Sequence, residues 1–246
     1  NQGHPTPTQR GFDQFYGIVA GAANFFHPRK LMENETLIDI DPPDFYLTDA
    51  ISENAVSMIT KASATDNPFF LHVAYTAPHW PLHALEEDIA KYRGHYREGW
   101  DSLRQNRHEE QKGMGIIDNK WDISPRDASS RPWEEAEDKE WEDLRMAVYA
   151  AMIDRMDQGI GKILTKLEEL GEDKNTVIMF LSDNGGCAEF LAEDTTRPDP
   201  SQYSSPTRDG RSMTIGNRKD LEPGTDTTFM SYDLAWANAS NTPFRR

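Results

Sequence analysis

The chain has 246 residues and a formal net charge of −16, with 37% hydrophobic and 28% charged residues. This composition is typical of a polar-rich globular domain, and the acidic excess argues against a nucleic-acid-binding protein, because phosphate contacts need clustered Lys and Arg. No apolar run approaches the ~20 residues that span a bilayer, and the single cysteine, Cys187, excludes internal disulfides and paired-cysteine metal sites.

The first third of the chain predicts a loop, a short hairpin, a helix and a strand, in that order. Residues 1–30 have the character of a loop, and residues 31–47 alternate as in a short surface hairpin or strand. Thr48 or Asp49 can cap a helix that runs to about residue 64. The aromatic and β-branched run at 69–75 then predicts a buried strand.

A histidine held between two prolines follows this strand. Pro78 and Pro81 restrict the backbone on both sides of His79, within Ala77-Pro-His-Trp-Pro-Leu82. An imidazole fixed just beyond a strand end can contact an anion or protonate a leaving group. The alternative is an ordinary loop histidine, and the same two readings apply to His83, which is not held between prolines.

The middle of the chain predicts helices. Short helices are expected within 85–131, and a long one from about Glu134 to Leu170 that ends at Gly171. The acidic run at the start of the long helix is interpreted as a solvated first turn, and Asp154 and Asp157 as solvated or salt-bridged. The apolar face of this helix comprises Leu144, Val148, Ala151, Met152, Ile160, Ile163, Leu164 and Leu167.

A second buried strand is predicted at 177–181, and it ends in Ser182-Asp-Asn-Gly-Gly186. Ligands of α/β sheets gather beyond the carboxyl ends of strands, and the oxygens of Asp183 and Asn184 are hard donors suited to Ca²⁺ or Mg²⁺. The alternative is a plain Asx-turn. Because helices and strands alternate, the predicted fold class is α/β, with a mostly parallel central sheet flanked by helices.

The last part of the chain lacks periodicity over 191–229, and a short helix or turn is expected at 231–238. Taken together, a hard-cation site and a clamped imidazole at two strand ends suit the hydrolysis of an anionic ester. At this point the chain resembles the sulfatases of the alkaline phosphatase superfamily. The matching motifs, in the family's order, are Arg10-Gly-Phe-Asp13 with Phe15-Tyr-Gly17, Ala77–Leu82, Ser182–Gly186, Trp236-Ala-Asn238 and Asn241-Thr-Pro-Phe-Arg245.

The resemblance implies that Asp183 and Asn184 bind calcium, or magnesium in some members, and that His79 contacts the sulfate ester and assists the departure of the leaving group. It also implies that the formylglycine nucleophile and the remaining metal ligands lie before Asn1. Residues 1–246 would then be the central part of one catalytic domain, inactive alone, with insertions at about 85–131 and 191–229. The expected substrate is a small-molecule or glycan sulfate ester, in a periplasmic, secreted or lysosomal compartment.

One internal pattern and two rival functions accompany this expectation. Ser204-Ser-Pro-Thr-Arg208 fits the pattern of a formylglycine site but follows the Asp-Asn pair instead of preceding it, so we interpret it as a coincidence. A phosphodiesterase or phosphonate monoester hydrolase of the superfamily usually has His where Asn184 stands. The other rival is a non-catalytic member that binds sulfated glycans.

Overall fold

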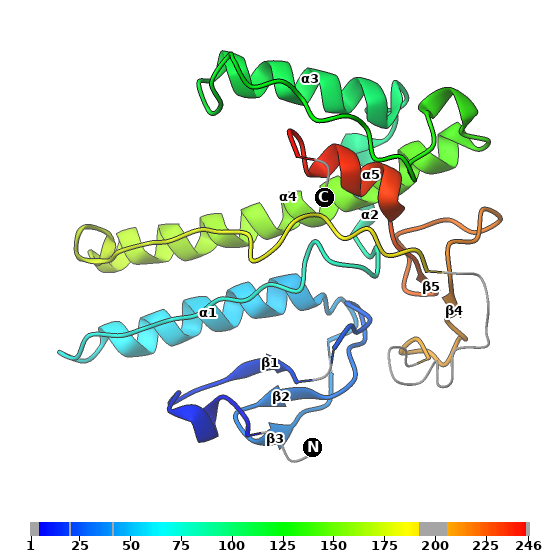
Figure 1. Ribbon diagram of the computed structural model, residues 1–246. Helices are drawn as coiled ribbons and strands as arrows, with labels where there is room; N and C mark the ends of the chain where they lie inside the picture. Colours follow the sequence, from blue (N-terminus) through cyan, green and yellow to red (C-terminus); the bar gives the residue numbers. More distant parts are fainter. Residues whose placement is uncertain (1–4, 20, 41, 192–205, 245–246) are drawn as a thin grey trace.

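Two long helices lie side by side and form the frame of the molecule (Figure 1). The computed structural model describes residues 5–19, 21–40, 42–191 and 206–244. Helix α1 (Leu47–Ser63) confirms the predicted helix, and its Ala55 and Ile59 are buried. The second long helix is α4 (Lys139–Leu170), which packs against α1 and the shorter α2 (Glu86–Tyr92).

Helix α4 begins later than predicted and buries only part of the expected face. A 3-10 turn, η2 (Trp133–Glu135), precedes it, and the extended backbone of Ala136 separates the two. The helix ends as predicted at Gly171, whose φ of 72° places it in the left-handed region. Leu164 is 36% exposed, because the C-terminal half of α4 extends beyond α2 and α5 (Figure 1).

The remaining helices surround the first half of α4. They are α3 (Gly99–Gly113) and α5 (Asp233–Ser240), with 3-10 turns η1 (Thr8–Arg10) and η3 (Asp173–Asn175) elsewhere. Trp100, Trp133 and Trp236 pack their rings together between these helices, with Trp100 and Trp236 at 5.4 Å between centroids. Burial of such large rings is the main apolar contribution to this part of the core.

The strands form two small sheets. Strands β1 (Tyr16–Ile18), β2 (Leu31–Glu33) and β3 (Thr36–Leu37) pair antiparallel, which confirms the predicted hairpin. Strands β4 (Thr214–Ile215) and β5 (Thr228–Phe229) form a short parallel pair within the stretch that lacks periodicity.

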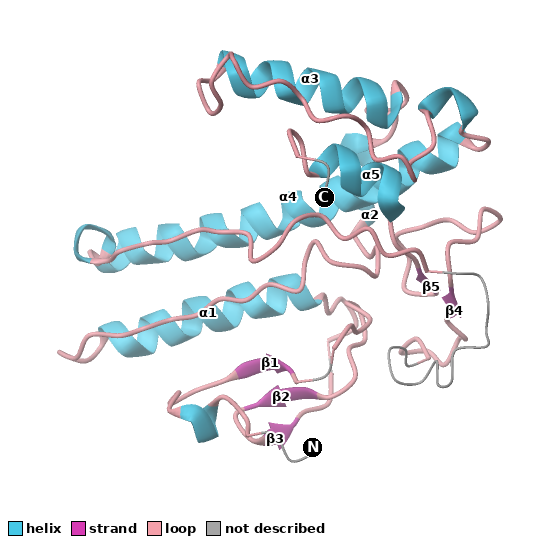
Figure 2. Ribbon diagram, viewed as in Figure 1, coloured by secondary structure: helices cyan, strands magenta, loops and turns pink. Residues whose placement is uncertain are grey.

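The predicted central parallel sheet is not formed among the described residues. The segments 69–75 and 177–181 are extended but pair with no strand in the described part of the chain, and they run beside α1 and α4 as irregular chain (Figure 2). Burial alternates along 69–75, with odd positions half-buried and even positions exposed, as expected of a strand covered on one face. The apolar side chains of 177–181 are exposed, Val177 at 87%. An apolar run predicts an extended segment, whereas a sheet also needs neighbouring strands.

Membrane insertion by a helix finds no support in the part of the chain that the structure describes. Within it, every helix is too short or too polar to cross a bilayer.

Candidate functional site

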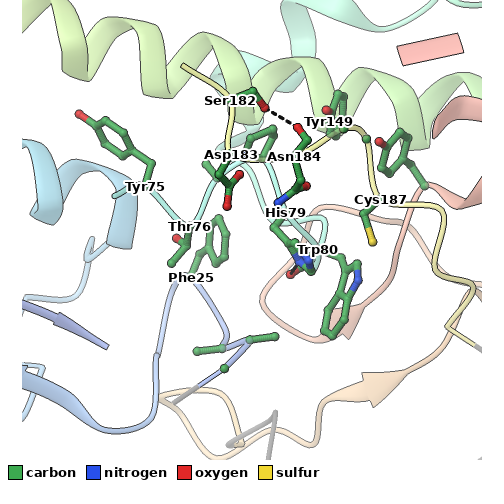
Figure 3. A pocket seen from close by; sticks show the side chains of 18 residues that line it. Phe25, Tyr75, Thr76, His79, Trp80, Tyr149, Ser182, Asp183, Asn184 and Cys187 are labelled. Carbon is green, nitrogen blue, oxygen red and sulfur yellow. Dashed lines mark hydrogen bonds between the residues drawn. The ribbon is translucent and has the colours of Figure 1, made fainter. Parts of the chain in front are cut away.

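A pocket of about 370 Å³ lies where the two extended segments end (Figure 3). The loop after residue 75 contributes Thr76, His79 and Trp80 to it, and the loop after residue 181 contributes Asp183 and Asn184. Glycine and alanine residues at 21–23 and the rings of Phe25, Tyr149 and Tyr232 form other parts of the wall. The structure therefore brings together the two loops that the sequence analysis paired.

His79 is held so that one ring nitrogen is engaged and the other is not. Its Nδ1 lies 3.0 Å from the carbonyl oxygen of Trp80, and since a carbonyl can only accept, Nδ1 carries the proton. The backbone N–H of His79 donates to the oxygen of Thr76 at 3.1 Å, which closes the turn. Nε2 has no hydrogen-bond partner among the described residues, and the side chain is exposed in the pocket. An imidazole in this state can exchange a proton at Nε2.

Asp183 and Asn184 present oxygen donors to the same space. Both are exposed, and Figure 3 shows their side chains among those that line the pocket with His79. The hydroxyl of Ser182 donates to the backbone oxygen of Asn184 at 2.7 Å, which sets the local turn. A carboxylate and an amide oxygen on adjacent residues fit a hard divalent cation, but a complete site needs more ligands. Among the described residues there is no group of three or more His, Cys, Asp or Glu that could supply them.

The turn after these residues is fixed by Asn241, which follows α5. The Oδ1 of Asn241 accepts from the N–H of Gly186 at 2.7 Å, and its Nδ2 donates to the Gly186 oxygen at 3.4 Å. A Cβ on Gly185 would lie 2.6 Å from this Oδ1, and one on Gly186 would lie 2.5 Å from the hydroxyl of Tyr232. Glycine is therefore required at both positions for the backbone to approach α5 so closely.

A tryptophan and a glutamate join the two loops directly. The indole N–H of Trp80 donates to Oε2 of Glu189 at 2.8 Å. Trp80 is 9% exposed and packs with Leu191 and Phe229 in a small apolar cluster, against which Cys187 also lies. The neighbour of His79 thus anchors the chain that follows Asp183 and Asn184, which fixes the relative position of the candidate residues.

Two tyrosines in the wall had no site role in the sequence analysis. Tyr149 of α4 and Tyr232 stack with ring centroids 4.3 Å apart and an interplanar angle of 17°. Burial raises the pKa of both phenols, so both are neutral near pH 7. Tyr149 lies in the predicted long helix and Tyr232 in the predicted turn beside the site, but neither segment indicates on its own that the two rings meet.

His83 is a structural histidine and not a residue of the candidate site, which decides between the two interpretations of the sequence. It is fully buried, its Nδ1 accepts from the N–H of Phe25 at 3.2 Å, and its Nε2 donates to the oxygen of Thr228 at 2.6 Å. Burial lowers the pKa of this imidazole to about 4. His83 does not line the pocket and instead ties the N-terminal loop to β5.

The other residues discussed in the sequence analysis lie as follows. Cys187 is half-buried in the pocket wall as a free thiol. Asp154 accepts from Lys91, Tyr92 and Gln158, so its interpretation as a salt-bridged residue is confirmed. Ser204 lies outside the described residues.

Comparison with known proteins decides the family. The family model described as Sulfatase matches residues 1–214. The chain belongs to the sulfatase family. An uncharacterised sulfatase of Schizosaccharomyces pombe is 31% identical over 97% of this chain and 44% of its own length, and an arylsulfatase of Klebsiella aerogenes is 33% identical over 97% and 51%. The chain therefore spans about half the length of these sulfatase relatives.

Solved structures give weaker similarity. The crystal structure of Ps i-CgsB is 25% identical, with a TM-score of 0.44 over 68% of this chain and 31% of the other. A second crystal structure of that protein, in complex with k-i-k-neocarrahexaose, has a TM-score of 0.43. The assignment to the sulfatases rests on the family model and the sequence relatives.

Proposed function

We propose that the protein is a sulfuric ester hydrolase of the arylsulfatase type and that this chain carries part of its active site. The observation that carries the proposal is the meeting of His79 with Asp183 and Asn184 in one pocket of a sulfatase-family chain. The arylsulfatase of Klebsiella aerogenes supports sulfate over phosphate esters, because this relative covers nearly the whole chain.

The residues present suggest a separate role for the metal ligands and for the histidine. Asp183 and Asn184 would hold one side of a Ca²⁺ or Mg²⁺ ion, which when bound supplies positive charge opposite the sulfate oxygens. His79 keeps its Nδ1 proton on the carbonyl of Trp80. When Nε2 also carries a proton, it would donate that proton to the ester oxygen that leaves, and the ring would return to its neutral form. No described residue takes the role of the formylglycine nucleophile, so that part of the reaction remains an expectation from the family.

The walls of the pocket favour an ester with an apolar or ring-shaped alcohol. Phe25, Tyr149 and Tyr232 line it together with Trp80, so aromatic surface lies close to His79. We further infer that 69–75 and 177–181 are two strands of the parallel sheet expected for the family. The half-buried, half-exposed alternation along 69–75 supports this inference.

The test uses the full product of the natural gene with a small aryl sulfate as substrate. We expect hydrolysis that requires Ca²⁺ or Mg²⁺, and we expect the 246-residue chain alone to be inactive. Asp183→Ala should abolish the metal-dependent activity, with Asp157→Ala on the exposed face of α4 as the matched control. Calorimetry that shows unaltered metal affinity in Asp183→Ala would refute the ligand assignment, and binding of sulfated glycans without turnover would favour the non-catalytic alternative.

A further inference from the structure

A second pocket, of about 320 Å³, lies on the other side of the turn that carries Tyr232. Tyr232 lines the first pocket and Asp233 the second, and likewise Cys187 lines the first and Phe190 the second. The second pocket draws its wall from the loop before η2, from the first two turns of α4, from the first turn of α5, and from Asn217 and Lys219. The proposed reaction uses none of its residues.

A buried arginine is the central feature of this pocket. Arg145 is 3% exposed; one of its Nη atoms donates to the oxygen of Ser231 at 2.9 Å, and the other donates to Glu142. Its Nε is buried without a partner among the described residues, and so is the hydroxyl of Ser130, a residue 6% exposed. Buried donors without an acceptor are unfavourable, so two in one wall indicate a ligand that supplies acceptors.

Each acidic or amide side chain of the pocket wall accepts at least one hydrogen bond from the protein. Glu142 accepts from Arg131 at 2.9 Å, from the indole of Trp236 at 3.2 Å, and from Arg145. The amide oxygen of Asn217 accepts from the N–H of Ser231 at 2.8 Å. Asp233 accepts from the N–H of Leu234 in the first turn of α5. The buried atoms of this wall without a partner among the described residues are the Nε of Arg145 and the hydroxyl of Ser130, while Asp233 keeps a second carboxylate oxygen.

The charges of the wall include two guanidinium groups. Arg131 is 41% exposed, and one of its Nη atoms donates to Glu142. Its guanidinium therefore keeps further N–H donors beside the pocket. Lys219 also lines the pocket but is paired with Glu137 and Asp138 at 2.7 and 2.8 Å. Two guanidinium groups thus share the carboxylate of Glu142, and the carboxylate of Asp233 in the same wall balances their remaining charge.

We propose that this second pocket binds an oxyanion, either a sulfate or a carboxylate group, through Arg131, Arg145 and Ser130. A planar guanidinium matches the geometry of such groups, and the first turn of α5 adds its dipole to the attraction. The group can come from a free inorganic anion or from an anionic sugar. Its binding does not depend on the proposed hydrolysis, because no residue of the first pocket contributes to it.

The test follows the Nε–H resonance of Arg145 by NMR while inorganic sulfate, and separately a sulfated monosaccharide, is added at constant ionic strength. We expect a shift that saturates with either ligand. Tighter binding of the sulfated monosaccharide would show that the pocket takes an anionic group attached to a sugar, whereas equal affinities would show that it takes a free inorganic anion. Arg131→Gln should weaken the affinity at least about 5-fold, as expected for one charge-assisted hydrogen bond. Ser130→Ala should weaken it as well.

Two controls separate this site from the first pocket. Arg93→Gln changes an arginine of similar exposure, 38%, which pairs with Glu86 and Glu222 away from the pocket, and it should leave the affinity unchanged. Asp183→Ala should also leave it unchanged, whatever its effect on hydrolysis. A shift that does not saturate, or that is the same in Arg131→Gln and in the unaltered chain, would overturn the proposal.

Discussion

The side-chain amide of Asn241 holds the backbone of Gly186 on both its polar groups, accepting from the N–H at 2.7 Å and donating to the oxygen at 3.4 Å. One residue after α5 thereby fixes the turn that follows Asp183 and Asn184. The two motifs are 55 positions apart in the chain, so their contact explains why both belong to the same site. The position of the candidate metal ligands depends on this pair.

Replacing Asn241 with alanine should therefore loosen the ligand loop. The variant loses two hydrogen bonds, and we expect a loss of about 1–2 kcal/mol in the free energy of unfolding, together with weaker Ca²⁺ binding by the full-length protein. Urea unfolding and calorimetry measure the two effects. Asn54→Ala removes a comparable bond, 2.9 Å to Ala50 within α1, and should leave Ca²⁺ affinity unchanged; equal affinities in all three proteins would contradict the account.

Two glycine substitutions should have opposite effects on stability. In Gly186→Ala the new methyl group would lie 2.5 Å from the hydroxyl of Tyr232, whereas in Gly161→Ala it meets nothing within 4 Å. We expect Gly186→Ala to destabilise by about 1–3 kcal/mol and Gly161→Ala, inside α4, to stabilise by up to about 1 kcal/mol. Thermal unfolding distinguishes them, and a Gly186→Ala variant as stable as the unaltered chain would show that the close approach to α5 is not required.

The residues of the candidate site could be predicted from sequence, but the contacts that hold their loops in place could not. His79 is recognisable because prolines flank it, and Asp183 and Asn184 because a polar turn ends an apolar run. The contacts from Asn241 to Gly186 and from Trp80 to Glu189 join positions far apart in the chain, and no local pattern encodes such pairs. The sequence could not distinguish His83 from His79 for the same reason. Only the contacts of His83 with Phe25 and Thr228 show that His83 is structural.

The buried imidazole of His83 should make stability fall in mild acid. Its pKa is about 4 in the folded chain and about 6.5 when unfolded, so the unfolded state binds more protons between these values. The contribution is present above about pH 6.5 and is lost as the pH falls toward about 4, and it amounts to about 2 kcal/mol between about pH 7 and about pH 5.

Measurement of this pH dependence needs a variant because carboxylates also titrate. Urea unfolding of His83→Gln should show a flatter profile over this range than the unaltered chain, and substitution of the exposed His72 by Gln should not. If His83→Gln does not fold, NMR titration of the His83 ring in the unaltered chain gives the same information. A ring that becomes protonated near pH 6.5 in the folded chain would contradict the assignment.

The exposed segment 177–181 should make the chain bind apolar dyes and self-associate. Val177 and Phe180 are 87% and 76% exposed. An apolar extended segment that pairs with no other described strand favours edge-to-edge pairing. We expect Phe180→Lys to reduce dye fluorescence and the apparent mass in sedimentation. Leu37→Lys, at a side chain 63% exposed in β3, is the matched control; equal effects of the two variants would show that the segment has no special role.

The fold could be predicted from sequence to the extent that contacts are local. Helices α1 and α4, Gly171 and the hairpin of β2 and β3 follow from periodicity, capping and turn residues close to one another in the chain. The central sheet was the exception, because apolar runs at 69–75 and 177–181 specify extended backbone but carry no information about which strands lie beside them. The predicted burial of Leu164 is wrong for a related reason. Helical spacing predicts which face of α4 is apolar, but not the length over which other elements cover that face.

The role of His79 is tested most directly with a series of aryl sulfates whose leaving phenols have pKa values from about 7 to about 10, compared in the full-length protein and in His79→Ala. General acid assistance is typically worth about 100-fold or more and matters most for poor leaving groups. The account predicts that His79→Ala lowers kcat strongly for the least acidic phenol and little for the most acidic one. Equal turnover of every ester by both proteins would remove His79 from the mechanism.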